Sequence, residues 1–369
     1  MRIASFNVES LFNRPKAMNQ ATWADGRVTL ENQAKVNGLL GEPIYTPSIK
    51  ADIVVLLKAL GLDKSDEGRT FAFLRQNRGH LLTRSNGKIT ITATGRDDWI
   101  GWVELKMEPV NEVATANTAR VIHELGAQIQ AVVEADNRTA LREFSDAMLK
   151  EVGGTPFDHV MLIDGNDTRG IDVGLMTRAG FDIVSMSSHV EDTDAKGRIF
   201  SRDCPVFTIR TPNGSELVVL VNHFKSKGYG RQADNDALRL RQSTRVKAIY
   251  DEVRAAGQPN VVVCGDFNDD PAAATLQPLL GSTDLKDASK HPTFDDGGRK
   301  GTFGNCTPSQ KFDYVLLSPA LFALVGGGGI FRCGAWGGKN GTMWDHYPGM
   351  MRQEQAASDH CAIFVDVAL

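Results

Sequence analysis

The sequence lacks most of the features that mark secreted or membrane-spanning proteins. Its five cysteines are odd in number and form no Cys-x-x-Cys pair, which favours reduced, mostly structural thiols over a disulfide framework. No stretch approaches the roughly 18 uncharged apolar residues that a membrane span needs. The first ten residues contain no long apolar segment of the kind found in secretory signal peptides. We therefore expect a cytoplasmic protein that does not bind membranes.

An excess of positive charge is also missing. Lysine and arginine number 41 against 45 aspartates and glutamates, which gives a formal net charge of −4. This balance excludes a protein that holds polyanions through its overall charge, so a nucleic-acid partner would need a local basic patch. A pocket of carboxylates around a metal ion is equally compatible with it. At 369 residues the chain can bury a large core, as one large domain or two ordinary ones.

Apolar runs that end in polar residues recur along the chain and predict β-strands. They lie at residues 3–10, 129–136, 159–165, 170–178, 217–224, 260–268, 312–318 and 361–369. Helical periodicity predicts helices at residues 48–62, 139–150 and 233–253, and a short helix entered at Pro271. Helices interspersed with strands in mixed order predict a layered α/β architecture.

Two segments interrupt this pattern. Residues 13–125 contain the helix at 48–62 and then an alternating stretch that predicts a β-hairpin turning at residues 95–98. Residues 326–350 are rich in glycine and aromatic residues and predict a long loop, with Trp336 and Trp344 as candidates for stacking on a ligand.

Polar side chains follow the predicted strands at the points where those strands end or begin. They are Asn7, Glu9, Glu134, Asn222, His223, Asp266, Asn268, Asp313, Asp359 and His360. Strand ends converge on the ligand site of an open α/β sheet. Carboxylates gathered there repel one another unless a cation holds them. A site rich in oxygen and free of cysteine favours a hard cation such as Mg²⁺ or Mn²⁺.

Six short motifs occur in a fixed order along the chain: SFNVE, VVE, NHFKSK, GDFN, FDY and SDH. Together they resemble the endonuclease/exonuclease/phosphatase (deoxyribonuclease I-like) superfamily, and within it the bacterial nuclease-like branch. The resemblance implies a four-layer α/β sandwich, in which two mixed β-sheets pack face to face between helices. It implies a single domain over residues 1–369, with residues 13–125 as an insertion.

The resemblance also implies a metal site for one or two Mg²⁺ or Mn²⁺ ions. Glu134 would be the principal ligand, with Glu9 and Asp359 as nearby carboxylates. Residues 51–57 imitate the start of the family's glutamate-bearing strand, but no acid follows them. Glu134 is therefore the better match.

The catalytic roles follow the same motifs. Asp266 would orient or deprotonate the attacking water, and Asn268 and Asn7 would position the water, a ligand or a phosphate oxygen. His360, paired with Asp313, would contact the scissile phosphate as an acid or as an electrostatic clamp. His223 matches the second histidine of the deoxyribonuclease-like members, the alternative being a structural histidine.

Cations at one of the motifs and at one further strand start are candidates for binding substrate phosphates. Lys225 and Lys227 follow His223, and Arg169 with Asp172 lies at another strand start. The alternative for the two lysines is a solvated loop.

The resulting prediction is a divalent-metal-dependent phosphodiesterase that hydrolyses nucleic acid, with DNA as the favoured partner, by in-line attack of an activated water on phosphorus. The alternative is a phosphatase or phosphodiesterase for a small phosphorylated metabolite or lipid head group. A scaffold protein on an inactive fold is disfavoured because every motif keeps its functional residue.

Overall fold

The computed structural model describes residues 1–20, 23–228 and 230–369, and these residues form two compact units. The first unit consists of Met1–Phe12, Val110–Lys227 and Arg231–Leu369, and the second of Asn13–Pro109 with Gly228–Gly230. The sequence predicted one domain with an insertion at 13–125. In the structure Asn13–Pro109 form a compact unit of their own, and residues 110–125 belong to the first unit.

The first unit contains a seven-stranded mixed sheet among the described residues. Its strands lie in the order β18 (Phe294–Asp295), β20 (Val325–Phe331), β21 (Ala362–Val367), β1 (Arg2–Asn7), β8 (Ile129–Ala135), β10 (Asp172–Thr177) and β9 (His159–Leu162). The central strand β1 runs parallel to β8 and antiparallel to β21.

A second, six-stranded sheet of the same described region faces it. Its order is β11 (Asp182–Ser187), β14 (Val206–Arg210), β15 (Glu216–His223), β16 (Val261–Asp266), β19 (Asp313–Leu317) and β17 (Lys286–Asp287). Strand β15 is parallel to β16, and β16 is antiparallel to β19. A small separate ribbon pairs β12 (Thr193–Asp194) with β13 (Gly197–Arg198).

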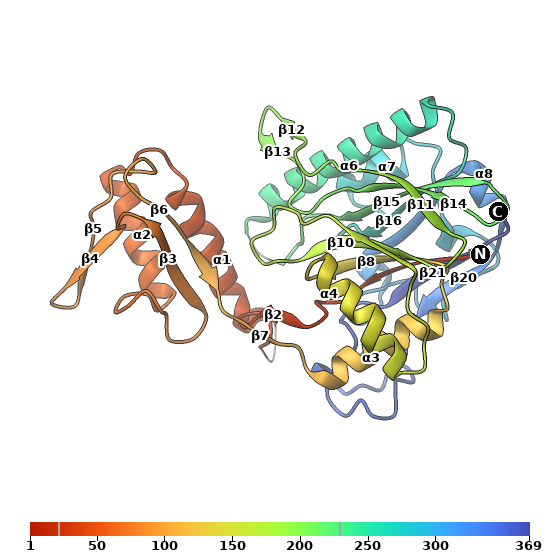
Figure 1. Cartoon of the computed structure of the whole chain (residues 1–369), viewed down its shortest axis with the longest axis horizontal. Coiled ribbons are helices and arrows are strands. Elements are labelled where there is room, and N and C mark those ends of the chain that lie inside the picture. The colour runs from red at the N-terminus through yellow and green to blue at the C-terminus, as the bar shows by residue number, and fades with distance from the viewer. Residues whose placement is uncertain (21–22, 229) are drawn as a thin grey trace. The chain divides into compact units, whose positions relative to one another are not determined.

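Three apolar clusters hold these layers together. The inner faces of the two sheets meet through side chains such as Ile129, Val133, Val219 and Val262, all fully buried. A second cluster joins the outer face of the seven-stranded sheet to the helices between residues 112 and 151, and a third joins the other sheet to the helices at residues 232–255 and 277–280. Figure 1 shows the resulting sequence of helix, sheet, sheet and helix. The predicted four-layer α/β sandwich is confirmed.

The helices and helical turns of this unit are short apart from two. They are α3 (Glu112–Leu125), α4 (Arg138–Glu143), the π-helical turn η1 (Phe144–Met148), α5 (Leu149–Glu151), α6 (Gln232–Ala255), η2 (Ala274–Leu276), α7 (Gln277–Leu280), η3 (Ala288–Lys290), η4 (Pro308–Gln310), α8 (Pro319–Phe322) and η5 (Gln353–Gln355). The prediction for 233–253 is confirmed by α6. The single helix predicted at 139–150 is interrupted by the π-helical turn.

The prediction of a loop at residues 326–350 is wrong for the first part of that segment. Residues up to Phe331 form β20, because their backbone pairs with β21 in spite of four consecutive glycines. The two tryptophans of the remaining loop pack against the protein itself. Trp336 stacks on His346 at 5.2 Å between ring centroids, and the Trp344 indole donates to the Ala335 carbonyl at 3.0 Å.

The second unit places two helices against short β-ribbons. The helices are α1 (Trp23–Leu40) and α2 (Pro47–Ala59), and the ribbons pair β2 (Asn13–Pro15) with β7 (Met107–Pro109), β3 (Ala72–Arg78) with β6 (Ile100–Leu105), and β4 (Leu82–Ser85) with β5 (Lys88–Ile91). The helix predicted at 48–62 is confirmed by α2, which Thr46 caps through the backbone N–H of Ile49. The predicted hairpin is wrong, because β5 and β6 pair with different partners rather than with each other.

All five cysteines lie in the described part of the chain and carry free thiols, as predicted. Among helices formed by described residues, none has the length and hydropathy to cross a membrane.

Candidate active site

The polar strand ends identified in the sequence lie next to one another at one edge of the sheets. The strand register pairs His223 at the end of β15 with Asp266 at the end of β16, and Asp266 with Asp313 at the start of β19. In the facing sheet, Asn7 at the end of β1 pairs with Val133 of β8. Sheet pairing alone therefore brings together residues that are far apart in the sequence.

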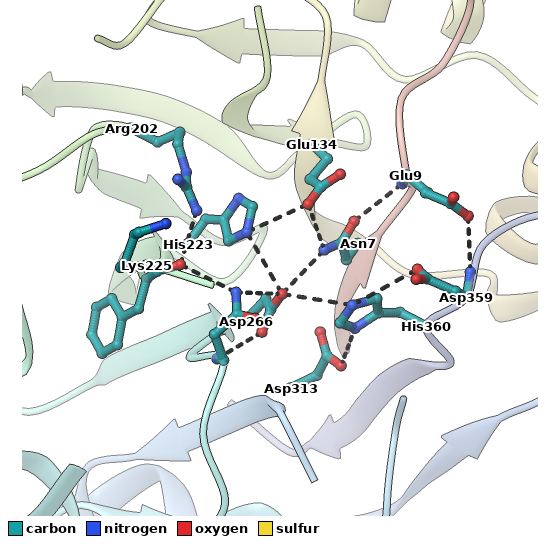
Figure 2. Close-up of polar contacts among 12 residues, drawn as sticks. Asn7, Glu9, Glu134, Arg202, His223, Lys225, Asp266, Asp313, Asp359 and His360 are labelled. Carbon is teal, nitrogen blue, oxygen red and sulfur yellow. Dashed lines mark hydrogen bonds and ion pairs between the residues drawn. The ribbon is translucent and has the colours of Figure 1, made fainter. Parts of the chain in front are cut away.

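Asp266 is the centre of the polar network shown in Figure 2. It is 1% exposed. Its Oδ1 accepts the backbone N–H of Asn268 at 2.8 Å, and its Oδ2 accepts the side-chain amides of Asn268 at 3.1 Å and Asn7 at 3.2 Å. Three donors thus fix the orientation of this carboxylate.

Two histidines flank Asp266 at equal distance. The Nε2 atoms of His223 and His360 each lie 3.7 Å from Asp266 Oδ2. The Nδ1 atom of His360 lies 2.8 Å from Asp313 Oδ2, and Nε2 of His223 lies 3.5 Å from Glu134 Oε1. Each ring is therefore held between two carboxylates.

The environment separates the proton affinities of these groups. Burial raises the pKa of Asp266 to about 7, although the His360 charge opposes this. Burial also lowers the pKa of His360, but the charges of Asp313 and Asp266 outweigh it and raise that pKa well above its usual range. The pKa of His223 is held well below its usual range by burial and then by the charge of Arg202. The surroundings therefore favour the charged form of His360 and the neutral form of His223.

Three acidic side chains line the more open side of the network. Glu134 Oε1 accepts the Asn7 amide at 3.3 Å, and Glu9 Oε2 accepts the backbone N–H of Asp359 at 3.1 Å. Two further contacts join these acids to the rest of the network. Glu9 donates its backbone N–H to Asn7 Oδ1 at 3.1 Å, and Asp359 Oδ1 lies 3.9 Å from Nε2 of His360. Oxygen donors of this kind suit Mg²⁺ or Mn²⁺.

A second group of possible metal ligands overlaps the centre. Asp266, Asp313 and His360 present ligand atoms within 4.8 Å of one another, and all three are buried. The imidazolium of His360 already neutralises part of this negative charge through its contact with Asp313. The more exposed carboxylates, Glu134 and Asp359, fit a hard divalent ion better.

The backbone is strained at three of the predicted site residues. Glu9, Glu134 and Asn268 adopt φ angles of 51°, 65° and 53°, a left-handed region that non-glycine residues rarely occupy. Gly265 has φ 128°, and a side chain there would collide with the Asn222 carbonyl. Strain of this kind persists where the surrounding structure enforces it, and it is common at active sites.

A β-bulge explains how Glu134 reaches the site. Asp172 of β10 pairs with Ala135, but the next residue, Val173, pairs with Val133, so Glu134 is the extra residue in β8. Its carbonyl accepts the backbone N–H of Ser10 at 3.1 Å. A bulge bends its strand and redirects a side chain, here away from the alternating core pattern.

Arg169 and Lys225, predicted as phosphate contacts, belong to a cationic group beside His223 in which the arginines are buried and Lys225 is partly buried. Arg169 pairs with Asp167 at 2.7 Å, and Arg202 pairs with the same carboxylate at 3.1 Å. Burial, followed by the charges of Arg169 and Arg202, lowers the pKa of Lys225 to about 7. Three cations therefore lie near one another with Asp167 between the two arginines.

Lys227 and Asp172 have different surroundings from the other predicted phosphate contacts. Lys227 forms an ion pair with Asp269 on the loop that follows Asn268. Asp172 is buried, accepts the backbone N–H of Gly165 at 2.7 Å, and has its pKa raised to about 7 chiefly by burial.

Sequence reasoning missed Arg202 and Thr302. Arg202, 1% exposed, donates to the Phe224 carbonyl at 2.8 Å, and that carbonyl also accepts the Asn268 amide at 3.1 Å. The Thr302 hydroxyl accepts the backbone N–H of Asp313 at 3.0 Å. Neither residue lies at the end of a predicted strand, so no pattern in the sequence identified them.

A family model described as Endonuclease/Exonuclease/phosphatase family matches residues 96–297, more than half of the chain. A search of curated protein sequences gave no significant match.

Solved structures of similar fold include a mannosyl-6-phosphatase of Bacteroides thetaiotaomicron VPI-5482, with a TM-score of 0.52 and 16% identity over 70% of this chain and 92% of that one. An endonuclease/exonuclease/phosphatase family protein from the same species gives a TM-score of 0.52 and 17% identity over 69% and 86%. The catalytic domain of human Nocturnin with bound sulfate gives 0.50 and 16% over 70% and 87%. These similarities concern the four-layer fold.

Proposed function

The chain belongs to the endonuclease/exonuclease/phosphatase family, and on that premise we propose that it is a divalent-metal-dependent phosphodiesterase that hydrolyses nucleic acid, with DNA as the favoured substrate. Members of the family are metal-dependent phosphoric ester hydrolases.

One observation carries the proposal. A buried carboxylate, Asp266, lies between His223 and His360 at 3.7 Å from each, and burial and neighbouring charges move the pKa values of the two rings in opposite directions. Hydrolysis of a diester needs a group that takes the proton of water and groups that stabilise the developing charge. Two titratable groups whose pKa values are driven apart can take such separate roles.

The proposed chemistry begins with a water molecule on Asp266. The carboxylate orients this water and accepts its proton while the water oxygen forms a bond to phosphorus. The Asn268 and Asn7 amides, both bound to Asp266, fix the carboxylate in place. The His360 imidazolium, held by Asp313, faces the phosphoryl oxygens and stabilises their added negative charge. The bond from phosphorus to the leaving oxygen then breaks, the neutral His223 ring donates its N–H to that oxygen as a hydrogen bond, and the oxygen takes up a proton from solvent.

We propose that Glu134, with Glu9 and Asp359, holds one or two Mg²⁺ or Mn²⁺ ions. The ion would polarise a phosphoryl oxygen and stabilise the negative charge on the reacting group. Its ligands would come from two strained positions, Glu9 and Glu134, whose φ angles direct their side chains out of the regular strand pattern.

The buried cations suit the substrate phosphate. Guanidinium and ammonium groups bind phosphate oxygens through charge-assisted hydrogen bonds, and we propose that Arg169 and Lys225 do so, with Lys227 at the edge. Asp172 is better suited to orient the backbone at Gly165, because a carboxylate would repel the phosphate.

The charge distribution favours nucleic acid over a small ester. Residues 13–109 contain fourteen lysines and arginines against eleven aspartates and glutamates, whereas the rest of the chain is acidic. A locally basic unit is what a polyanionic substrate requires of an acidic protein. The acidic remainder supports a second candidate, a phosphatase or diesterase for a phosphorylated metabolite or lipid head group, and one protein of similar fold is a mannosyl-6-phosphatase.

Cleavage assays with four substrates separate the two candidates. Supercoiled plasmid, single-stranded DNA, bis(para-nitrophenyl) phosphate and para-nitrophenyl phosphate are incubated with Mg²⁺, Mn²⁺ or EDTA. Metal-dependent DNA cleavage that falls steeply with rising salt supports the nuclease, because a polyanion loses affinity as counterions compete. Hydrolysis of the monoester alone, independent of salt, supports the second candidate and contradicts the first.

A further inference from the structure

Two cysteine thiols lie together directly behind the catalytic histidine. The Sγ atoms of Cys306 and Cys361 are 3.5 Å apart, and the residues are 1% and 2% exposed. Cys361 follows His360 in the sequence, but neither thiol takes part in the chemistry proposed above. Both belong to a small apolar cluster with Ala335.

The two thiols lie on two segments that are paired with each other. One is residues 359–361, called the catalytic segment because it carries His360, and the other is the loop at residues 301–306. The backbone N–H of Cys361 donates to the Thr302 carbonyl at 2.6 Å, and that of Gly304 donates to the Asp359 carbonyl at 3.1 Å. The Phe303 ring packs on the His360 ring at 4.9 Å between centroids. The position of His360 therefore depends on how residues 301–306 pair with residues 359–361.

We propose that Cys306 and Cys361 are a redox-sensitive dithiol, and that a small-molecule disulfide converts them into a disulfide bond that inactivates the enzyme. The effect on activity rests on the proposed function, whereas formation of the bond does not.

The exchange proceeds in two steps. The Cys306 thiolate attacks one sulfur of the small disulfide, which forms a mixed disulfide and releases one equivalent of small thiol. The Cys361 thiol then loses its proton and attacks the Cys306 sulfur, which releases the second equivalent. Two electrons pass from the protein to the small disulfide, and the protein loses two hydrogens.

Cys306 is the better attacking group of the pair. Its contact with the Cys361 thiol, and then the Arg332 guanidinium, lower its pKa. Burial instead raises the pKa of Cys204 and of Cys264. The thiolate is the reactive form of cysteine, so Cys306 differs in this respect from Cys204 and Cys264, and the close approach of Cys361 Sγ makes it the partner of the exchange.

Closing the bond would move the catalytic segment. A disulfide has a sulfur separation of about 2.05 Å, so the two sulfurs must approach by about 1.5 Å from their present 3.5 Å. His360 is the next residue, and its Nδ1 is 2.8 Å from Asp313. Because a misplacement of about 1 Å can cost about 100-fold in rate, we expect at least about a tenfold loss of activity.

The test oxidises the native full-length protein with glutathione disulfide and follows two readouts. Mass spectrometry after digestion without reduction identifies the cross-linked peptides, and hydrolysis of bis(para-nitrophenyl) phosphate reports activity. We expect the Cys306–Cys361 cross-link, the loss of activity in parallel with it, and recovery of both with dithiothreitol.

Variants separate this pair from other thiols. Cys306→Ala and Cys361→Ala should keep basal activity and become insensitive to the oxidant, while Cys333→Ala, which removes a half-buried thiol, should stay sensitive. Unmodified thiols after prolonged oxidation, or a cross-linked enzyme with full activity, would overturn the proposal. A cross-link in a protein that hydrolyses none of the substrates would support the dithiol and contradict the proposed function.

Discussion

Glu134→Gly and Glu134→Ala remove the same carboxylate but should differ in stability. The glycine variant should be the more stable of the two, whereas alanine is usually more stabilising than glycine within a helix or strand. Glu134 has φ 65° and is the extra residue of a β-bulge. Its neighbours Val133 and Ala135 pair with β10, and its own carbonyl accepts the Ser10 N–H at 3.1 Å, so the backbone is held on both sides of the strained residue. Alanine keeps the strain of the left-handed conformation, whereas glycine relieves it.

The expected difference is about 1 kcal/mol in the free energy of unfolding. A left-handed conformation costs a non-glycine residue roughly 1–2 kcal/mol. Against this, the greater freedom of glycine in the unfolded chain costs about 0.5–1 kcal/mol. At Glu134 the first quantity is larger, so the glycine variant should be the more stable of the two.

The assay is urea unfolding in EDTA, so that metal binding does not contribute to stability. Glu143 provides the matched control, because it is an exposed glutamate with a right-handed helical φ of −61°. There the glycine variant should be less stable than the alanine variant by about 1 kcal/mol. Equal stabilities at position 134, or the same order at both positions, would refute the argument that strain is stored at Glu134.

Three other changes test the surroundings of the site. Asp313→Asn removes a charge that raises the pKa of His360, so His360 should lose its proton at lower pH and the alkaline limb of the pH–rate profile should move down; an unmoved limb contradicts the pairing. Arg202→Lys breaks the network at the Phe224 carbonyl and should lower kcat about tenfold with little change in KM, for a loss of about 1–2 kcal/mol; a change in KM alone would argue for substrate binding. Gly265→Ala should destabilise the protein by roughly 1–3 kcal/mol in urea unfolding, because φ 128° and the nearby carbonyl exclude a side chain; wild-type stability would show that the strands can separate there.

The resemblance carried by the six motifs implied the sandwich, and the polar ends of the predicted strands indicated the residues that meet at its edge. Apolar runs define the strands, and chemistry-bearing side chains such as Asp266 stand where those strands end, so their convergence follows from the layered architecture. Strand pairing then confirmed that His223, Asp266 and Asp313 are lateral neighbours.

Features that depend on pairing and backbone shape were not predictable from periodicity. The hairpin expected around residues 95–98 failed because its two strands pair with β4 and β3, a choice made by packing in the second unit. Strand β20 was missed because glycines hide the alternation that marks a strand. Arg202 was missed because it contacts the backbone carbonyl of Phe224, and a contact with the backbone does not depend on a recognisable pattern of side chains.

The most direct test of the account compares the wild-type enzyme with Asp266→Asn in the metal-dependent hydrolysis of bis(para-nitrophenyl) phosphate. The substitution preserves the shape of the side chain and removes the charge that accepts the proton of water. Asp251→Asn, on the exposed surface of α6, is the matched control. The account predicts a fall of about 100- to 10,000-fold for Asp266→Asn and none for the control. Activity of Asp266→Asn close to that of the wild type would contradict the central claim that Asp266 activates the attacking water.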